Sequence, residues 1–106
     1  MNKDKHKIFQ VPENIKVIMN IRHDGTEIII DVKNLSNGDM YISRFDDIEY
    51  AASTIAAIYD AYMVDVAVIN TAGYGLAVYD RICNLPINII PLKCRKIQIS
   101  SALLEK

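Results

Sequence analysis

Apolar and polar residues alternate strictly in the first half of the chain and predict three strands. Apolar side chains recur at every second position over residues 15–22 and again over residues 28–33, which is the period of a strand with one buried face. The turn-forming residues His23-Asp24-Gly25 separate the two segments. Asn37-Gly38, which tolerates the positive φ of a tight type I′ turn, precedes a third strand over residues 39–45. Together the three segments predict an antiparallel meander.

At Asp46 the apolar period changes from two residues to 3.6, which predicts a helix. Asp46 is the predicted N-cap, and Glu49, three residues later, is its predicted capping-box partner. Residues 64–69 follow, and this segment is short, β-branched and apolar on both faces beyond Asp65. Such a segment is typical of a strand that is covered on both sides.

A turn over residues 70–75 separates this buried strand from a second predicted helix over residues 76–83. Residues 87–90 predict a further short strand, which Pro91 ends. The last stretch, residues 97–106, fits either a strand or a terminal helix. The predicted order of elements is therefore β-β-β-α-β-α-β, an α/β fold with a mixed sheet.

The organisation of the chain is predicted to be simple. Four charges in the first seven positions predict a poorly ordered N-terminal arm over residues 1–13. Residues 14–106 then form one predicted domain, because 106 residues are enough for one hydrophobic core and too few for two.

Composition and charge narrow the choice of partner. The chain is 51% hydrophobic and 24% charged, the balance of an ordinary globular domain. Its net charge of −1 provides no overall attraction to a polyanion, so nucleic acid is not the expected partner. Basic clusters at residues 3–7 and 93–96 fit solvated chain segments, or a shared basic patch if folding brings them together.

The apolar segments and the cysteines of the sequence predict the location of the chain and the state of its thiols. No apolar stretch approaches the ~20 residues of a membrane span, and the start lacks a secretory apolar region. We therefore expect no membrane association and a cytoplasmic location. Cys83 and Cys94 lack the close spacing of metal or redox motifs and are predicted to be buried free thiols.

The predicted order of elements resembles the ribonuclease H-like fold, and one part of the chain carries a closer likeness. In the nuclease domain of the large terminase subunit of tailed phages, an apolar strand leads into Asp, Thr, any residue, Gly, any residue, Gly. A helix containing Tyr-Asp and a strand ending in Ile-Pro then follow. Over residues 47–92 this chain is similar, with the matching segments Val66–Gly75, Tyr79-Asp80 and Ile90-Pro91.

This resemblance implies a divalent-metal nuclease acting on DNA, with acids in the first strand and at the entry to the Gly-x-Gly turn. Here those two positions hold Asn20 and Asn70. An amide offers oxygen lone pairs to a metal ion but cannot neutralise its charge. The family's third acid lies near the C-terminus, where this chain has Glu105. If the chain is active, Glu49, Asn70 and Asn20 are the candidate catalytic residues, since ribonuclease H enzymes carry a glutamate in the first helix.

Asp65 is a poor substitute for the missing acids. It lies at the beginning of its strand, about five residues or ~16 Å from the turn at 3.3 Å per residue, which places it at the other end of the sheet. His6 and His23 lie in the arm and at a hairpin tip, with no nucleophile at a telling spacing.

The turn itself allows two interpretations, and both remain open. Its glycines let the chain reverse tightly after a buried strand, which is a purely structural role. Alternatively, Asn70, Thr71, Gly73, Tyr74 and Gly75 form an anion-binding edge at the start of a helix.

Three functional hypotheses follow. The first is a non-catalytic protein-interaction or regulatory module on a degenerate ribonuclease H-like scaffold of phage or mobile-element origin, without a cofactor. Its partner is another protein or a second copy, since tyrosines are numerous and the edge strands of a small open sheet suit strand addition. The second is a nuclease that uses Mg²⁺ or Mn²⁺. The third is a fragment or accessory subunit whose last acid comes from a missing segment.

Overall fold

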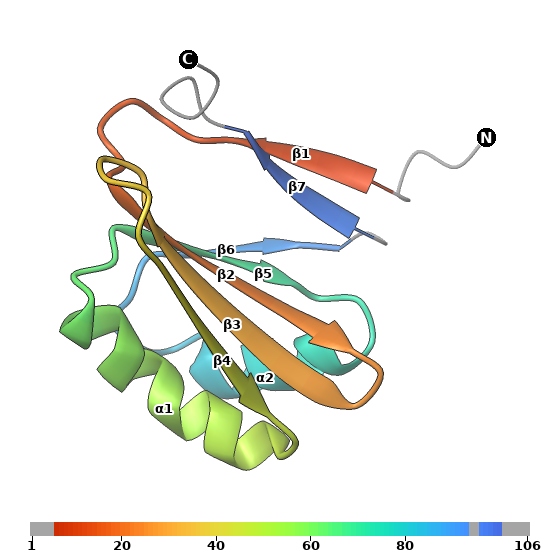
Figure 1. Cartoon of the computed structure of the whole chain (residues 1–106). Coiled ribbons are helices and arrows are strands. Elements are labelled where there is room, and N and C mark those ends of the chain that lie inside the picture. The colour runs from red at the N-terminus through yellow and green to blue at the C-terminus, as the bar shows by residue number, and fades with distance from the viewer. Residues whose placement is uncertain (1–5, 94–95, 101–106) are drawn as a thin grey trace.

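The computed structural model describes residues 6–93 and 96–100 (Figure 1). Strands and helices alternate along the chain after an initial run of strands. In chain order they are β1 (His6–Gln10), β2 (Val17–Asp24), β3 (Glu27–Asn34), β4 (Met40–Phe45), α1 (Ile48–Ala61), β5 (Val66–Asn70), α2 (Tyr74–Ile82), β6 (Ile89–Leu92) and β7 (Lys96–Ser100).

A five-stranded mixed sheet forms the centre of the fold. β2, β3 and β4 make an antiparallel meander, and β5 pairs in parallel with β2 and with β6. The strand order across the sheet is therefore β4-β3-β2-β5-β6. β5 is buried over all five of its residues, as a strand covered on both sides must be. The α/β class, the meander and the buried strand are thus confirmed.

Both helices lie on one face of the sheet, and the β1–β7 pair lies on the other (Figure 1). The main core fills the space between helices and sheet, where Met19, Ile21, Ile55 and Ile82 are almost completely buried. Neither helix in the part of the chain that the structure describes is long and apolar enough to cross a membrane.

A second apolar cluster lies on the face away from the helices. Its sheet residues include Ile18, which alternates with the helix-facing Met19 and Ile21 of the same strand. Successive side chains of a strand point to opposite faces of the sheet. The two clusters therefore show which face each of the remaining sheet residues lies on. The buried members of this second cluster are Val11, Ile15, Ile18, Leu35, Val66 and Val68.

β1 differs from what the sequence pattern predicts for residues 1–13. Within the predicted arm, His6–Gln10 form a strand that pairs in parallel with β7. The same pairing makes residues 97–100 a strand, the first of the two structures that fit this segment. Parallel pairing joins segments that are distant in sequence. The local alternation that predicts a hairpin therefore cannot predict the β1–β7 pair.

The predicted cap of the first helix is wrong by one residue. Asp47, and not Asp46, is the N-cap of α1, because its backbone is extended and its carboxylate accepts a hydrogen bond from the Tyr50 amide. Glu49 therefore sits one position too early for a capping box. Its carboxylate instead accepts a hydrogen bond from the Nε of Arg81 in α2 at 2.6 Å.

Two smaller predictions also need correction. Cys83 is exposed, because it follows the buried Ile82 at the C-terminus of α2 and points about 100° further round the helix, away from the core. Cys94 lies outside the described residues. The β3–β4 connection is longer than a two-residue type I′ turn: Gly38 has a positive φ, whereas Asn37 does not.

Candidate functional site

Asn20 and Asn70, the two asparagines that the sequence analysis singled out, lie on neighbouring strands. β2 and β5 pair in parallel with Asn20 beside Val68, so Asn70 is two residues further along, an offset of about 7 Å. Val68 belongs to the cluster on the face away from the helices. By alternation, Asn20, Arg22 and Asn70 face that same side, and the register of the two strands ends at Ile21 and Ile69, one residue before Arg22 and Asn70.

Asn70 is a buried polar residue, with only 6% of its surface exposed. Its side-chain Oδ1 accepts a hydrogen bond from the Ala72 amide at 3.0 Å. The next residue, Thr71, donates its amide to the carbonyl of Leu92 at 2.9 Å, which ties the turn to β6. The Asn70 amide group therefore holds the turn in shape.

The two glycines of the turn are both required by the fold. A Cβ at Gly75 would lie 1.7 Å from the carbonyl oxygen of Asn70, so no other residue fits there. Gly73 has a φ of +57°, and a Cβ on it would lie 3.0 Å from the imidazole of His23. His23 also packs edge-on against the ring of Tyr74, with 6.1 Å between ring centroids. The structural interpretation of this turn accounts for its glycines.

The same backbone limits anion binding at the start of α2. The amides of Gly75 and Leu76 donate to the carbonyls of Ala72 and Gly73, each at 3.2 Å. Gly73 is the N-cap and has no side chain to accept a hydrogen bond. Part of the donor set that an anion would need is therefore already used within the turn.

Asp31 of β3 is a site residue that the sequence pattern did not reveal. It lies directly opposite Asn20 in the β2–β3 register, and the Nε of Arg22 donates to its Oδ2 at 3.0 Å. Among the described residues, its Oδ1 and the Oδ1 of Asn20 are buried without a donor. An amide at this place avoids the repulsion that a second carboxylate facing Asp31 would cause. The sequence signal that could have revealed Asp31 is its position in the hairpin, where it pairs with Asn20.

We call Asn20, Arg22, Asp31 and Asn70 the asparagine cluster. It combines two amides, one carboxylate and one guanidinium group on adjacent strands of a single sheet face. The positive charge that faces the carboxylate belongs to an arginine of the chain itself.

Neither of the other candidate acids joins this cluster. Glu49 lies on α1 and pairs with Arg81, on the face of the sheet that the helices cover. Asp65 accepts hydrogen bonds from the amides of Lys16 and Val17 at 2.8 and 2.9 Å, where β2 begins, so it lies at the opposite end of the sheet as predicted. Within residues 6–93 and 96–100, no group of three or more His, Cys, Asp or Glu side chains is placed to hold a metal ion. Glu105 lies outside the described residues.

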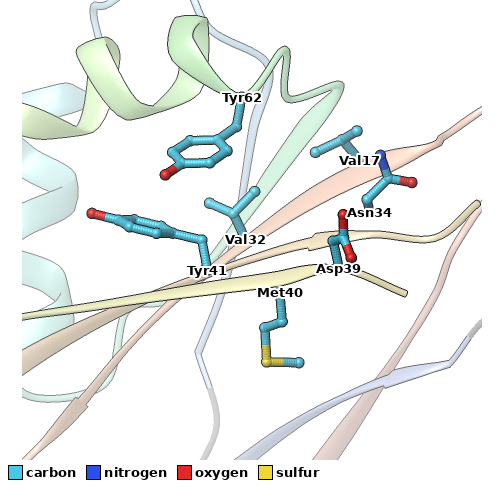
Figure 2. A pocket seen from close by; sticks show the side chains of 7 residues that line it. All are labelled: Val17, Val32, Asn34, Asp39, Met40, Tyr41 and Tyr62. Carbon is cyan, nitrogen blue, oxygen red and sulfur yellow. The ribbon is translucent and has the colours of Figure 1, made fainter. Parts of the chain in front are cut away.

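A pocket of about 180 Å³ opens near the end of the sheet where β4 begins (Figure 2). The rings of Tyr41 and Tyr62 stack on one side, with 4.6 Å between centroids and 26° between planes. The carboxylate of Asp39 lies on the other side, with Val32 between (Figure 2). We call this the tyrosine pocket, and its lining residues are Val17, Val32, Asn34, Asp39, Met40, Tyr41 and Tyr62.

The chemistry of the tyrosine pocket suits a small group. Its volume is below the 300–1,000 Å³ that is typical for drug-sized ligands. In the described part of the chain, Asp39 forms no ion pair. A carboxylate beside aromatic rings favours a compact cation. The sequence presents Tyr41 and Tyr62 as separate tyrosines, and only the packing of α1 against β4 brings their rings together.

Comparison with known proteins adds nothing to this geometry. No protein-family model matches the sequence, and no curated protein matches it. The function of the chain is therefore inferred from the asparagine cluster and the tyrosine pocket.

Proposed function

We propose that this chain is a non-catalytic protein-interaction module on a ribonuclease H-like scaffold of phage or mobile-element origin. The scaffold assignment is supported by an antiparallel meander whose first strand pairs in parallel with β5, and by β6 beyond it. It is also supported by two helices on one face, each of which connects parallel strands. This part of the proposal is an analogy of fold.

The observation that carries the proposal is the state of the asparagine cluster. A two-metal nuclease needs several charged oxygen ligands, because paired divalent cations repel one another strongly. Here Asn70 is used to hold its own turn, and the one carboxylate is paired with Arg22. The internal guanidinium group thus supplies the positive charge that a metal ion supplies in such a nuclease.

Exposed apolar side chains support the binding of another protein. They include residues of β4, of α1 and of the start of α2, and in a single copy of the chain they are exposed to solvent. Large apolar side chains that remain exposed on a small domain are typical of contact surfaces when they cluster. They are Met40, Ile42, Tyr50, Tyr62, Met63, Tyr74 and Leu76.

A second candidate function is a nuclease that uses Mg²⁺ or Mn²⁺. One observation favours it: Asp31 and Asn20 each bury an acceptor oxygen without a donor, and they face one another across two strands. Acceptor oxygens in this arrangement are the kind of group that a hard cation binds.

Incubation of the purified chain with plasmid DNA and Mn²⁺ separates the two functions. We expect no cleavage above that of an Asp31→Asn variant, with Asp80→Asn on α2 as the matched control that removes an exposed carboxylate. Cleavage that EDTA stops, and that Asp31→Asn but not Asp80→Asn abolishes, would overturn the proposal. An Asn20→Asp, Asn70→Asp double variant should gain Mn²⁺ affinity if the scaffold derives from a nuclease.

A further inference from the structure

β4 is an edge of the five-stranded sheet, and its outer side has no partner in the described part of the chain. The amide of Asn34 donates to the carbonyl of Asp39, which sets the alternation of the β3–β4 ladder. By that alternation Tyr41 and Ser43 direct their backbone groups to β3. Met40, Ile42 and Arg44, which alternate with them, direct theirs outward.

This edge lacks most of the features that keep edge strands apart. It has six residues and contains no proline and no lysine. Its one charge, on Arg44, already pairs with Glu27 of β3 at 2.9 Å. Met40 and Ile42 are 54% and 50% exposed on the face away from the helices. A strand of this kind readily pairs with another strand.

α1 lies beneath β4 and adds a second layer to the same edge. Tyr50 packs edge-on against Phe45 at one end of the strand, and Tyr62 stacks on Tyr41 at the other. Glu49 marks the flank of α1 that faces α2, because it pairs with Arg81. The opposite flank carries no charge over three turns, and its residues are Tyr50, Thr54, Ala57 and Ala61.

The sequence of β4 suits pairing with a second copy of itself. When β4 pairs with its own copy about Ile42, the two isoleucines meet, Met40 faces Arg44, and no like charges are opposed. The register about Arg44 would instead oppose two guanidinium groups. The same two-fold axis brings the uncharged flanks of the helices together, where Ala57 and Ala61 allow a close approach.

We infer that the chain forms a two-fold symmetric homodimer in which β4 pairs antiparallel with β4 of a second copy and α1 packs on its counterpart. The two sheets become one continuous sheet, with all helices on the same face. This inference rests on the proposed interaction function and names a second copy of the chain as the partner.

Sedimentation equilibrium of the full chain tests the dimer. We expect Ile42→Lys to raise the dissociation constant of the dimer about a hundredfold or more, because two lysines would then face each other at the axis. The control is Asn84→Lys just after α2, which adds the same charge at an exposed residue outside β4 and α1 and should leave the constant unchanged. Far-UV circular dichroism should show that both variants remain folded.

Cross-linking tests the register independently of stability. In a background with Cys83→Ser and Cys94→Ser, we expect Ile42→Cys to form an intermolecular disulfide on mild oxidation, whereas Asn84→Cys should not. Directly opposed residues at a hydrogen-bonded position have Cα atoms about 5.5 Å apart, which a disulfide can span.

A chain that stays monomeric at every concentration, or a dimer that Ile42→Lys does not weaken, would overturn the inference. The nuclease assay on the same preparations keeps the two proposals apart. A monomer without nuclease activity contradicts only the dimer, and a dimer with metal-dependent nuclease activity contradicts only the non-catalytic function.

Discussion

The asparagine cluster and the tyrosine pocket use their polar groups in opposite ways. In the cluster, Asn70 holds the turn that begins α2, and Asp31 is paired with Arg22. In the pocket, Asp39 forms no ion pair within the described residues, and two stacked tyrosine rings line the opposite side. The carboxylate of the cluster is therefore paired with an arginine of the chain, whereas the carboxylate of the pocket has no such partner among the described residues.

This difference shows that a motif and an open site need not coincide. The segment that resembles a nuclease is packed so tightly that a methyl group at Gly75 would overlap the backbone of Asn70. The pocket is lined by residues of β2, β3 and β4 and by Tyr62 just after α1, none of which belongs to a recognisable motif. The turn over residues 70–75 thus has a structural role, and the tyrosine pocket lies in another part of the fold.

Gly75→Ala should have the largest effect on stability. The added Cβ lies 1.7 Å from the carbonyl oxygen of Asn70, a backbone atom that cannot move without breaking the turn. We expect a loss of about 3 kcal/mol or more in the free energy of unfolding, measured by urea denaturation. Gly38→Ala is the control, because a Cβ there meets no atom within 4 Å and the cost is only the strain of its positive φ, about 1 kcal/mol. Equal losses would show that the turn tolerates expansion.

Asn70→Ala should have the next largest effect. It removes the acceptor of the Ala72 amide and leaves that partly buried donor without its partner, at a cost of about 2 kcal/mol. Asn70→Asp keeps an acceptor oxygen at the same place and should lose less. Thermal unfolding of the two variants checks the order of their stabilities. If Asn70→Asp were the less stable of the two, the turn would depend on the amide nitrogen and not on the oxygen.

Much of the fold could be predicted because its signals are local. The alternation of β2 and β3 and the apolar run of β5 identify themselves within a few residues of sequence. β1 and β7 could not be paired in this way, because each has its partner about ninety residues away. The N-cap of α1 was missed by one residue, since Asp46 and Asp47 offer the same chemistry and only the backbone of the folded chain distinguishes them.

The candidate site was less accessible to sequence reasoning. The likeness pointed to Asn20 and Asn70, and the register of β2 and β5 places them on one face. Asp31 was overlooked because its importance depends on facing Asn20 across a hairpin. The tyrosine pocket was not predicted, because the packing of two rings depends on how α1 crosses β4. Contacts of this kind depend on tertiary structure, and the pattern of a single segment does not contain them.

The smallest effects on stability should come from removing the carboxylate of the asparagine cluster, Asp31, or that of the tyrosine pocket, Asp39. Asp31→Ala leaves Arg22 without its partner and should lower the free energy of unfolding by about 1 kcal/mol, since the pair is partly exposed. Asp39→Ala removes a carboxylate that has no hydrogen bond or ion pair among the described side chains, so its cost should stay within about 0.5 kcal/mol. Parallel urea denaturation of the two variants measures both values. A larger loss for Asp39→Ala would mean that the carboxylate of the tyrosine pocket is engaged in the fold, and the distinction between the two regions would fail.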